Sequence, residues 1–180
     1  MDALEIQAAL KSFRVIVDTR EQNTPRAKER FDAIGCPIGR ETLRYGDYCG
    51  DVTLPDGSRS VRVDGNHSVH PVCVIERKMS ADELAGCFTR SRERFQREME
   101  RAVAEGCRVF LLVENCSFET ILNHRYRSRY NSNAFLASVT AWTARYGITP
   151  VFCKAETSGR IIRELLYRDL KERLERGDYG

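Results

Sequence analysis

The sequence predicts a single α/β domain in which a central mixed β-sheet is flanked by helices. The length of 180 residues is typical of one domain. The 42% hydrophobic and 31% charged residues are typical of a folded globular chain. Early apolar segments are separated by turn residues, as in hairpins, whereas later ones alternate with helical patterns. This order favours a sheet with both antiparallel and parallel strands.

The first half of the chain is expected to supply most of the strands. Residues 1–12 predict a short, loosely attached helix, an N-terminal extension to a domain spanning residues 13–176. A Pro in the first turn and Gly35 at the end favour a helix over 25–34. The expected strands cover 13–17 (ending on Asp18), 38–44, 48–54, its hairpin partner 60–63 after a turn at 55–58, and 72–75, which ends in Glu76-Arg77-Lys78.

Helices dominate the second half. Ser80 to Glu83 form a capping box that predicts one long helix continuing to about Glu105. Trp142 lies on the apolar face of another helix and is expected to be a core residue. The remaining elements are strands over 108–113 and 149–153 and a final helix over 158–174.

Composition excludes several classes of protein. The longest apolar run, residues 109–113, is far shorter than the about 20 residues of a membrane helix. The start resembles no secretion signal, which predicts an intracellular protein, cytoplasmic in a bacterium or phage and nuclear in a eukaryote. Seven cysteines without a CxxC pair predict reduced thiols and no structural zinc. The 24 Arg against 5 Lys favour either a phosphate-rich partner or a high-GC genome.

A charged cluster follows the strand at 72–75. Glu76 and Lys78 are two residues apart and therefore project from one face of the strand, while Arg77 points the other way. A lone pattern of this kind is more often an ordinary strand end, but further carboxylates are expected nearby. Oxygen ligands without His or Cys suit Mg²⁺ or Mn²⁺, and with a lysine they are typical of metal-assisted phosphodiester hydrolysis. These carboxylates are Asp18, Glu21, Asp47 and Asp82.

These residues match a known family. Val17-Asp18-Thr19-Arg20-Glu21, Gly46-Asp47-Tyr48 and the segment Glu76-Arg77-Lys78-Met79-Ser80-Ala81-Asp82 resemble the GD…ERKxxxD signature of XPF-type structure-selective nucleases. The resemblance covers about residues 13–153 and implies the PD-(D/E)xK restriction-endonuclease-like fold. It also implies a divalent-metal-dependent DNA endonuclease acting at branched, flap or forked DNA.

The resemblance assigns roles to the matching positions. It implies that Asp47 and Glu76 are the main metal ligands, with the Arg77 carbonyl beside them, and that Lys78 is the catalytic lysine. Asp18 is a third candidate ligand. Glu21 would support the metal or its waters, Asp82 would hold the site together, and Arg20 and Arg77 would meet phosphate or stabilise the acids.

The sequence departs from the family in two respects. Twenty-eight residues separate Asp47 from Glu76, and the excess over 55–71, which holds His67 and His70, predicts either a surface excursion or a DNA-contacting flap. Larger relatives also carry a helicase portion and a helix-hairpin-helix domain that helps to choose the DNA structure. Selectivity for forks or flaps is therefore open, as is the question whether a separate subunit supplies targeting.

Two basic segments are candidate DNA contacts. One side of the helix after Lys78 carries a basic stripe of Arg90, Arg94, Arg97 and Arg101. Glu93, Glu98 and Glu100 weaken its basic field, so an ordinary solvated face is the favoured explanation. In the loop 124–130, Arg125, Arg127 and Arg129 are expected to grip phosphates and Tyr126 to stack on bases, unless the tyrosines cap the core.

Alternatives remain open at this point. The apolar residues of the last helix predict either a homodimer through the late helices, as is common in the family, or simple packing on the sheet. A non-catalytic DNA-junction adaptor is the main alternative function, although such partners usually lack the acidic and lysine residues present here. A metal-binding domain without a nucleic-acid role leaves the arginine-rich loop unexplained, and a restriction-type enzyme shares the same core.

Overall fold

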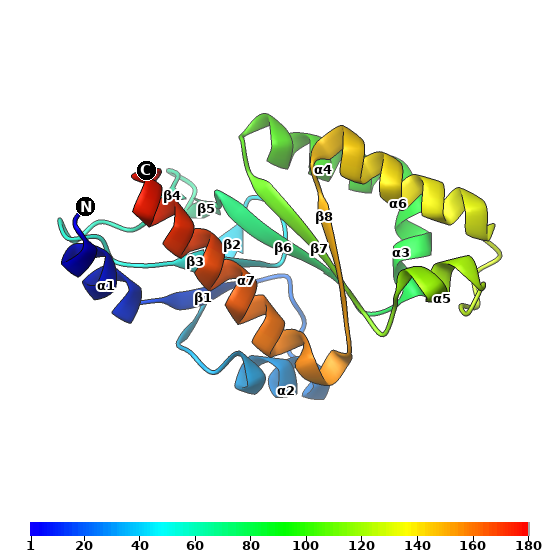
Figure 1. The fold of residues 1–180 in the computed structure, drawn as a ribbon, viewed down its shortest axis with the longest axis horizontal. Coiled ribbons are helices and arrows are strands. Elements are labelled where there is room, and N and C mark those ends of the chain that lie inside the picture. Colours follow the sequence, from blue (N-terminus) through cyan, green and yellow to red (C-terminus); the bar gives the residue numbers. More distant parts are fainter. Residues whose placement is uncertain (180) are drawn as a thin grey trace.

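The computed structural model describes residues 1–179 and contains one eight-stranded sheet with helices on both faces (Figure 1). The strands are β1 (Arg14–Asp18), β2 (Ile38–Leu43), β3 (Tyr48–Asp51), β4 (Arg62–Val63), β5 (Ser68–His70), β6 (Cys73–Lys78), β7 (Arg108–Glu114) and β8 (Thr149–Cys153). The helices are α1 (Ala3–Lys11), α2 (Pro25–Ile34), α3 (Ala81–Phe88), α4 (Arg92–Ala104), α5 (Phe118–Leu122), α6 (Ser132–Tyr146) and α7 (Ala155–Arg176).

The sheet is mixed, as predicted. Its strand order is β4-β5-β2-β1-β3-β6-β7-β8. The β3 strand runs antiparallel to both of its neighbours, whereas β6, β7 and β8 are mutually parallel. The carboxyl ends of β6 and β7 therefore lie side by side, and the Glu76-Arg77-Lys78 segment lies at this end of the two strands.

Alternate residues of the central strands serve two separate cores. On β7, Val109 and Leu111 belong to the core shared with α3, α4 and α6. Phe110 and Leu112 belong to the core shared with α1, α2 and α7. Because both faces are covered, these strands are continuous apolar runs without polar alternation. The same alternation sends Glu76 and Arg77 to opposite sides of the sheet.

The prediction of a single helix over 81–105 is wrong, because the helix is interrupted between α3 and α4. Thr89 leaves the helical region, and the amides of Thr89 and Ser91 both donate to the Gly86 carbonyl. The break lets Phe88 and Phe95 both pack on the buried Trp142 indole, at centroid distances of 4.9 and 5.0 Å. Tertiary packing thus outweighs the local helical pattern.

The hairpin prediction for 60–63 is only partly right. The turn at 55–58 exists, since the Leu54 amide donates to the Ser58 carbonyl and the Ser60 amide to the Val52 carbonyl. However, β4 pairs with β5, which itself pairs parallel with β2. The excess segment 55–71 therefore extends the sheet at the edge opposite β8. Both β5 and α5 are too short for periodicity to reveal them.

The terminal helices pack against each other. The α1 helix has a full capping box on Asp2, and Ile6 and Leu10 are buried against the α7 side of the sheet. The expectation of a loosely attached extension is therefore wrong. On α7, packing within the chain buries Ile162, Leu166, Leu170 and Leu174 and half-buries Ile161 and Leu165.

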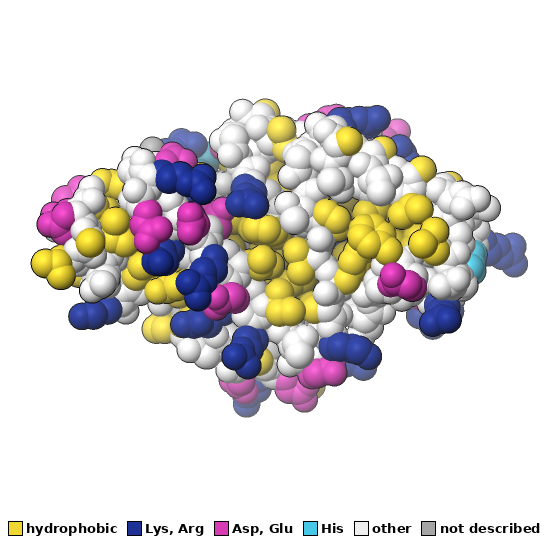
Figure 2. Space-filling view, in the orientation of Figure 1, with side chains coloured by type: hydrophobic (Ala, Val, Ile, Leu, Met, Phe, Trp, Pro, Cys, Tyr) yellow, Lys and Arg dark blue, Asp and Glu magenta, His cyan; other side chains and the backbone are white. Residues whose placement is uncertain are grey.

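The β8 strand is an edge strand with apolar surroundings. Figure 2 shows hydrophobic side chains between α6 and α7, where β8 lies. Phe118 and Leu122 of α5 are 38% and 50% exposed, and the Phe118 ring meets Phe152 at 4.9 Å. No helix within residues 1–179 has the length and apolar character needed to cross a membrane.

Candidate active site

A glycine turn places Asp47 beside the end of β6. Gly46 has φ +73°, and a Cβ there would lie 2.1 Å from Cγ2 of Val74, so only glycine fits. The turn is held by two backbone bonds, because the Asp47 amide donates to the Ile75 carbonyl and the Asp18 amide donates to the Asp47 carbonyl. The Asp47 carboxylate accepts the Arg77 amide at 2.7 Å.

Glu76 and Lys78 form a buried ion pair on the same side of β6. Glu76 is only 4% exposed, and its Oε1 accepts from the Lys78 ammonium. The Lys78 Nζ also lies 5.2 Å from the centre of the Phe95 ring. The other oxygen of Glu76, Oε2, is buried and has no hydrogen-bond partner within residues 1–179. A buried carboxylate oxygen left unpaired is costly and indicates a missing ligand.

These three side chains line one cavity of about 270 Å³. The sequence prediction that Asp47, Glu76 and Lys78 converge is therefore confirmed as geometry. The cavity also includes Arg94 and Glu98 of α4, which reach the site from a different element. Its remaining lining residues are Arg20, Cys87 and Phe95.

Burial and like charge shift the protonation of the site. Burial raises the pKa of Asp47 to about 6, against the opposing attraction of Lys78. Burial and the neighbouring Asp47 raise the pKa of Glu76 to about 8. Burial alone would lower the pKa of Lys78, but the Glu76 carboxylate outweighs it and the net shift is upward. Lys78 therefore stays protonated and positively charged.

Glu98 was missed by the sequence reasoning, which counted it only as an acid that weakens a basic helix face. Its charge raises the pKa of Glu76 and that of Arg20. Its carboxylate makes no hydrogen bond or ion pair within the described part of the chain. The only signal was its helical spacing from Arg94 and Phe95, and that spacing does not reveal which strand α4 covers.

Asp18 lies beside the turn but has no free oxygen to offer. Its carboxylate accepts from the Leu43 amide at 2.7 Å, from the Arg20 amide at 2.7 Å and from the Arg20 guanidinium at 2.7 Å. Asp18 is 1% exposed and does not line the cavity. The structure therefore gives it the role of fixing Arg20 and the β2 end, in place of the expected metal ligation.

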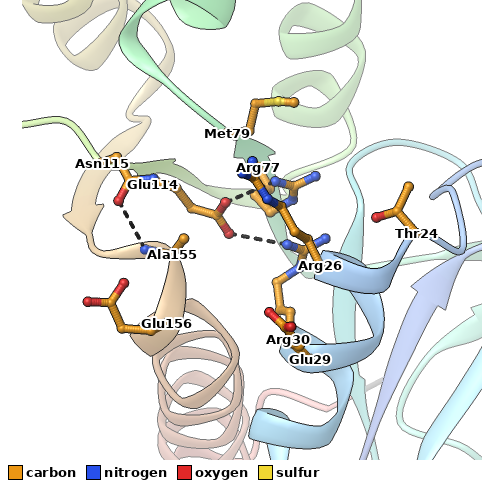
Figure 3. Close-up of a pocket in the computed structure, with 10 residues that line it drawn as sticks. All are labelled: Thr24, Arg26, Glu29, Arg30, Arg77, Met79, Glu114, Asn115, Ala155 and Glu156. Atoms are coloured by element: carbon orange, nitrogen blue, oxygen red, sulfur yellow. Dashed lines mark hydrogen bonds and ion pairs between the residues drawn. The ribbon is translucent and has the colours of Figure 1, made fainter.

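Glu21 and Arg77 lie on the other face of the sheet, in a buried network. Figure 3 shows Arg77 and Arg30 both turned toward Glu114. Their guanidinium groups donate to the Glu114 carboxylate at 3.2 and 3.3 Å, respectively. Glu21 accepts from Arg30 at 2.7 Å, from Arg77 at 3.1 Å and from the Tyr48 hydroxyl at 3.0 Å. This network supports the carboxyl end of β6 from behind. It also lines a second cavity, of about 450 Å³.

Asp82 holds the arginine-rich loop and does not reach the Asp47–Glu76 cavity. Its carboxylate accepts from the amides of Arg127 and Ser128 at 2.8 and 2.7 Å. These bonds lower the pKa of Asp82 against the opposing effect of burial. Asp82, Arg90 and Arg127 line a separate hollow. The expectation that Asp82 holds the catalytic site together is therefore corrected.

The loop tyrosines cap the core. The Tyr126 ring packs edge-on against the buried Phe135 at 5.3 Å and stacks on His124, and its hydroxyl donates to the Tyr130 carbonyl at 2.7 Å. The predicted base-stacking role of Tyr126 is therefore not supported. The three loop arginines, Arg125, Arg127 and Arg129, are exposed.

The donor set fits a hard divalent cation. Asp47 and Glu76 offer carboxylate groups at one cavity, and the buried Glu76 Oε2 has no hydrogen-bond partner within residues 1–179. Within residues 1–179, no group of three or more His, Cys, Asp and Glu side chains is gathered as a metal site. Two carboxylates with waters suit Mg²⁺, which is commonly bound this way, better than Zn²⁺.

Comparisons with known proteins identify structures of the same fold. No curated protein matches the sequence. The XPF protein from Aeropyrum pernix matches with a TM-score of 0.58 and 23% identity over 87% of this chain and 61% of that chain. Its structure in complex with DNA matches with a TM-score of 0.58 and 24% identity over 89% of this chain and 66% of that one. The chain thus spans less than two thirds of these structures, which share its fold.

The family model described as the ERCC4 domain matches residues 17–165. That range includes Asp18, Asp47, Glu76, Lys78 and Asp82, and it covers most of the chain. The XPF-type resemblance seen in the motifs is confirmed. The chain belongs to the ERCC4 domain family, whose members are generally DNA nucleases.

Proposed function

We propose that this protein is a divalent-metal-dependent DNA endonuclease that hydrolyses phosphodiester bonds at branched, flap or forked DNA. The observation that carries the proposal is the buried, unpaired Oε2 of Glu76, which lies beside Asp47 and Lys78 in an open cavity. The XPF structure in complex with DNA supports DNA as the substrate. A DNA substrate implies an intracellular place of action.

Asp47 and Glu76 would hold a Mg²⁺ or Mn²⁺ ion. When bound, the cation lowers the pKa of a water and neutralises charge that develops on the phosphate. The chain's own groups do the rest. Lys78, a firm cation, donates toward the phosphate or the attacking water and keeps its proton. Arg20 and Arg94 at the cavity wall hold the phosphate in place.

The proposed partners are DNA, a second copy of the chain and a targeting subunit. The exposed Arg90, Arg125, Arg127 and Arg129 would contact the DNA backbone around the site. A homodimer would form over the late helices and the apolar β8 edge, although α7 already buries most of its apolar face within the chain. A separate subunit would supply targeting to a particular DNA structure.

A cleavage assay tests the proposal. Labelled single-stranded, duplex, flap and forked DNA are incubated with Mg²⁺, Mn²⁺ or EDTA and with wild type, Asp47→Ala or Lys78→Ala. We expect metal-dependent cutting that both variants lose, because each removes a charged group from the cavity. Asp32→Ala and Lys28→Ala, two exposed changes on α2, are the matched controls and should cut normally.

Each other outcome has a clear meaning. Cutting retained by both cavity variants would refute the site. Tight binding to branched DNA without cutting under any metal would favour the second candidate, a non-catalytic DNA-junction adaptor. The intact charged cavity argues against that candidate.

A further inference from the structure

A basic hollow of about 260 Å³, different from the cavities described above, adjoins the proposed active site. It shares Arg20, Arg94 and Glu98 with the cavity of Asp47 and Glu76. Arg97 and Arg101 continue the wall along successive turns of α4, and Arg44 follows the end of β2. The full lining is Arg20, Arg44, Tyr45, Arg94, Arg97, Glu98 and Arg101. Five cations thus surround a space next to the scissile position with one acid among them.

Three of the five guanidinium groups of this basic hollow are poorly neutralised within the described part of the chain, whereas Arg20 pairs with Asp18 at 2.7 Å and Arg44 with Glu105 at 3.6 Å. The side chains of Arg94 and Arg101 make no hydrogen bond or ion pair within residues 1–179. Arg97 has only a 3.8 Å pair with Glu93, whose side chain is 92% exposed. Such exposed pairs contribute little, so the like charges remain largely uncompensated until an anion binds.

The wall of the basic hollow is rigid. Phe95 and Met99 anchor α4 in the core and fix the arginines that alternate with them. At the end of α4, Glu105 accepts from the Tyr45 hydroxyl at 3.3 Å and lies 2.9 Å from His70 Nδ1. Glu105 also lies 3.6 Å from Arg44 and 3.8 Å from Arg62, so its charge is shared among several groups and neutralises the hollow only in part. This clamp between β5 and α4 gives the excess segment 55–71 a structural use.

We propose that the basic hollow binds the sugar-phosphate backbone of the cleaved DNA strand on one side of the scissile phosphate. The inference rests on the proposed function and adds Arg44, Arg97 and Arg101 as contacts. Guanidinium forks suit phosphate oxygens, and contacts to the backbone carry no base preference. Arg94 and Arg101 are seven residues apart on α4, about 10 Å along the helix axis, which matches about three nucleotides at about 3.4 Å each, so we expect the contacts within that reach of the cut.

The first test compares two double variants with the same charge change. Arg97→Gln/Arg101→Gln removes two cations from the basic hollow. Arg145→Gln/Arg160→Gln removes two exposed cations from α6 and α7. Binding to forked DNA in EDTA is followed by fluorescence anisotropy over a range of salt. We expect the logarithmic salt slope of the hollow variant to fall by about 1.4 if the two lost phosphate contacts lie on single-stranded DNA and by about 1.8 if they lie on duplex, with no change in the control.

The second test locates the contacts along the strand. Single neutral methylphosphonate linkages are placed in turn along each strand around the fork. Wild type should lose binding several-fold at a few consecutive positions on one side of the cut, and the hollow variant should be insensitive at those same positions. Equal sensitivity of both proteins at every position, or an equal loss in the control variant, would refute the inference.

The outcomes separate this inference from the proposed function. Normal cutting by wild type together with unaltered binding by the hollow variant would refute the hollow and leave the nuclease intact. Position-specific binding without any cutting would support the hollow and contradict catalysis. A wild type that binds no DNA at any salt would contradict both.

Discussion

At the scale of single residues, the site combines a buried ion pair with an unsatisfied oxygen. Leaving Glu76 Oε2 unpaired costs about 1–3 kcal/mol, a penalty that a simple structural pair would avoid. The raised pKa values of Asp47 and Glu76 express the same cost as a reluctance to ionise. Stability is commonly given up in this way where a ligand is to be bound.

Asp47→Asn should therefore stabilise the metal-free protein at neutral pH. The folded-state pKa of Asp47 is raised from 3.8 to about 6, so its ionisation destabilises the fold increasingly from pH 4 to pH 6 and fully above that. The gain in melting temperature should be present at pH 7 and vanish below pH 4. Mn²⁺ should raise the melting temperature of wild type but not of the variant. Asp32→Asn is the exposed control, and a variant that melts lower than wild type at every pH would contradict the argument.

The affinity for Mn²⁺ should rise between about pH 6 and pH 8. Glu76 must lose a proton to bind a cation, and its pKa in the metal-free protein is about 8. Glu98→Gln removes a negative neighbour that raises this pKa, so the rise should move to lower pH. Calorimetry in buffers of different ionisation enthalpy measures the affinity and the released protons. An affinity that does not change with pH would refute this assignment.

At the scale of elements, one turn and one loop anchor decide where the charged groups lie. Gly46 brings Asp47 against β6 through a backbone conformation that side chains disfavour. Asp82 holds the loop over 124–130 to the start of α3, one turn beyond Lys78. The Gly46 turn and the Asp82 anchor serve different sites, because Asp47 lines the cavity with Glu76 whereas Asp82 lines the hollow with Arg90 and Arg127.

Gly46→Ala should lower the unfolding free energy by about 2–4 kcal/mol and abolish cutting. The new methyl group would clash with Val74, and the turn that carries Asp47 would have to move. Gly57→Ala is a matched control, since Gly57 also has positive φ but nothing lies within 4 Å of a Cβ there. That control should cost only about 1 kcal/mol and keep activity. Equal effects of the two changes in urea titrations would contradict the packing argument.

Asp82→Ala should weaken DNA binding without changing Mn²⁺ affinity. The change removes the acceptor of the Arg127 and Ser128 amides, so hydrogen exchange at these amides should accelerate. The loop arginines would then be less ordered, and we expect a several-fold loss of affinity for forked DNA. Glu119→Ala, an exposed acid on α5, should leave all three measurements unchanged. A loss of Mn²⁺ affinity would return Asp82 to the metal site.

At the scale of the whole molecule, a buried charge network joins segments that are distant in the sequence. Arg30 of α2 contacts Glu21, Tyr48 and Glu114, and Arg77 completes the network from β6. It lies behind the strand that carries Glu76, on the opposite face of the sheet. The active-site edge is therefore supported from both sides.

Arg30→Ala should destabilise the protein by about 3–5 kcal/mol, because it leaves two buried acids, Glu21 and Glu114, with Arg77 as their one remaining cation. Denaturant unfolding at neutral pH measures the loss. Arg160→Ala, an exposed change on α7, should stay within about 0.5 kcal/mol of wild type. A loss below 1 kcal/mol for Arg30→Ala would show that the network contributes little.

Much of the fold and the centre of the site could be predicted from local patterns. Strand period alone places Glu76 and Lys78 on one face and Arg77 on the other. The Pro25 start and Gly35 end of α2 follow from backbone chemistry at these residues. The grouping of Asp47 with Glu76 was also correct, although the same reasoning grouped Asp18, Glu21 and Asp82 with them, and it was the family motif that singled out Asp47.

Only the tertiary structure decided the rest. Asp18 is taken up by Leu43 and Arg20, Asp82 by a loop 45 residues away, and Glu98 comes to the cavity because α4 covers that face. The sequence by itself determined which residues are charged and how each element is phased. Which charges meet depends on strand register and helix packing between distant segments, and those are set by burial of the whole core.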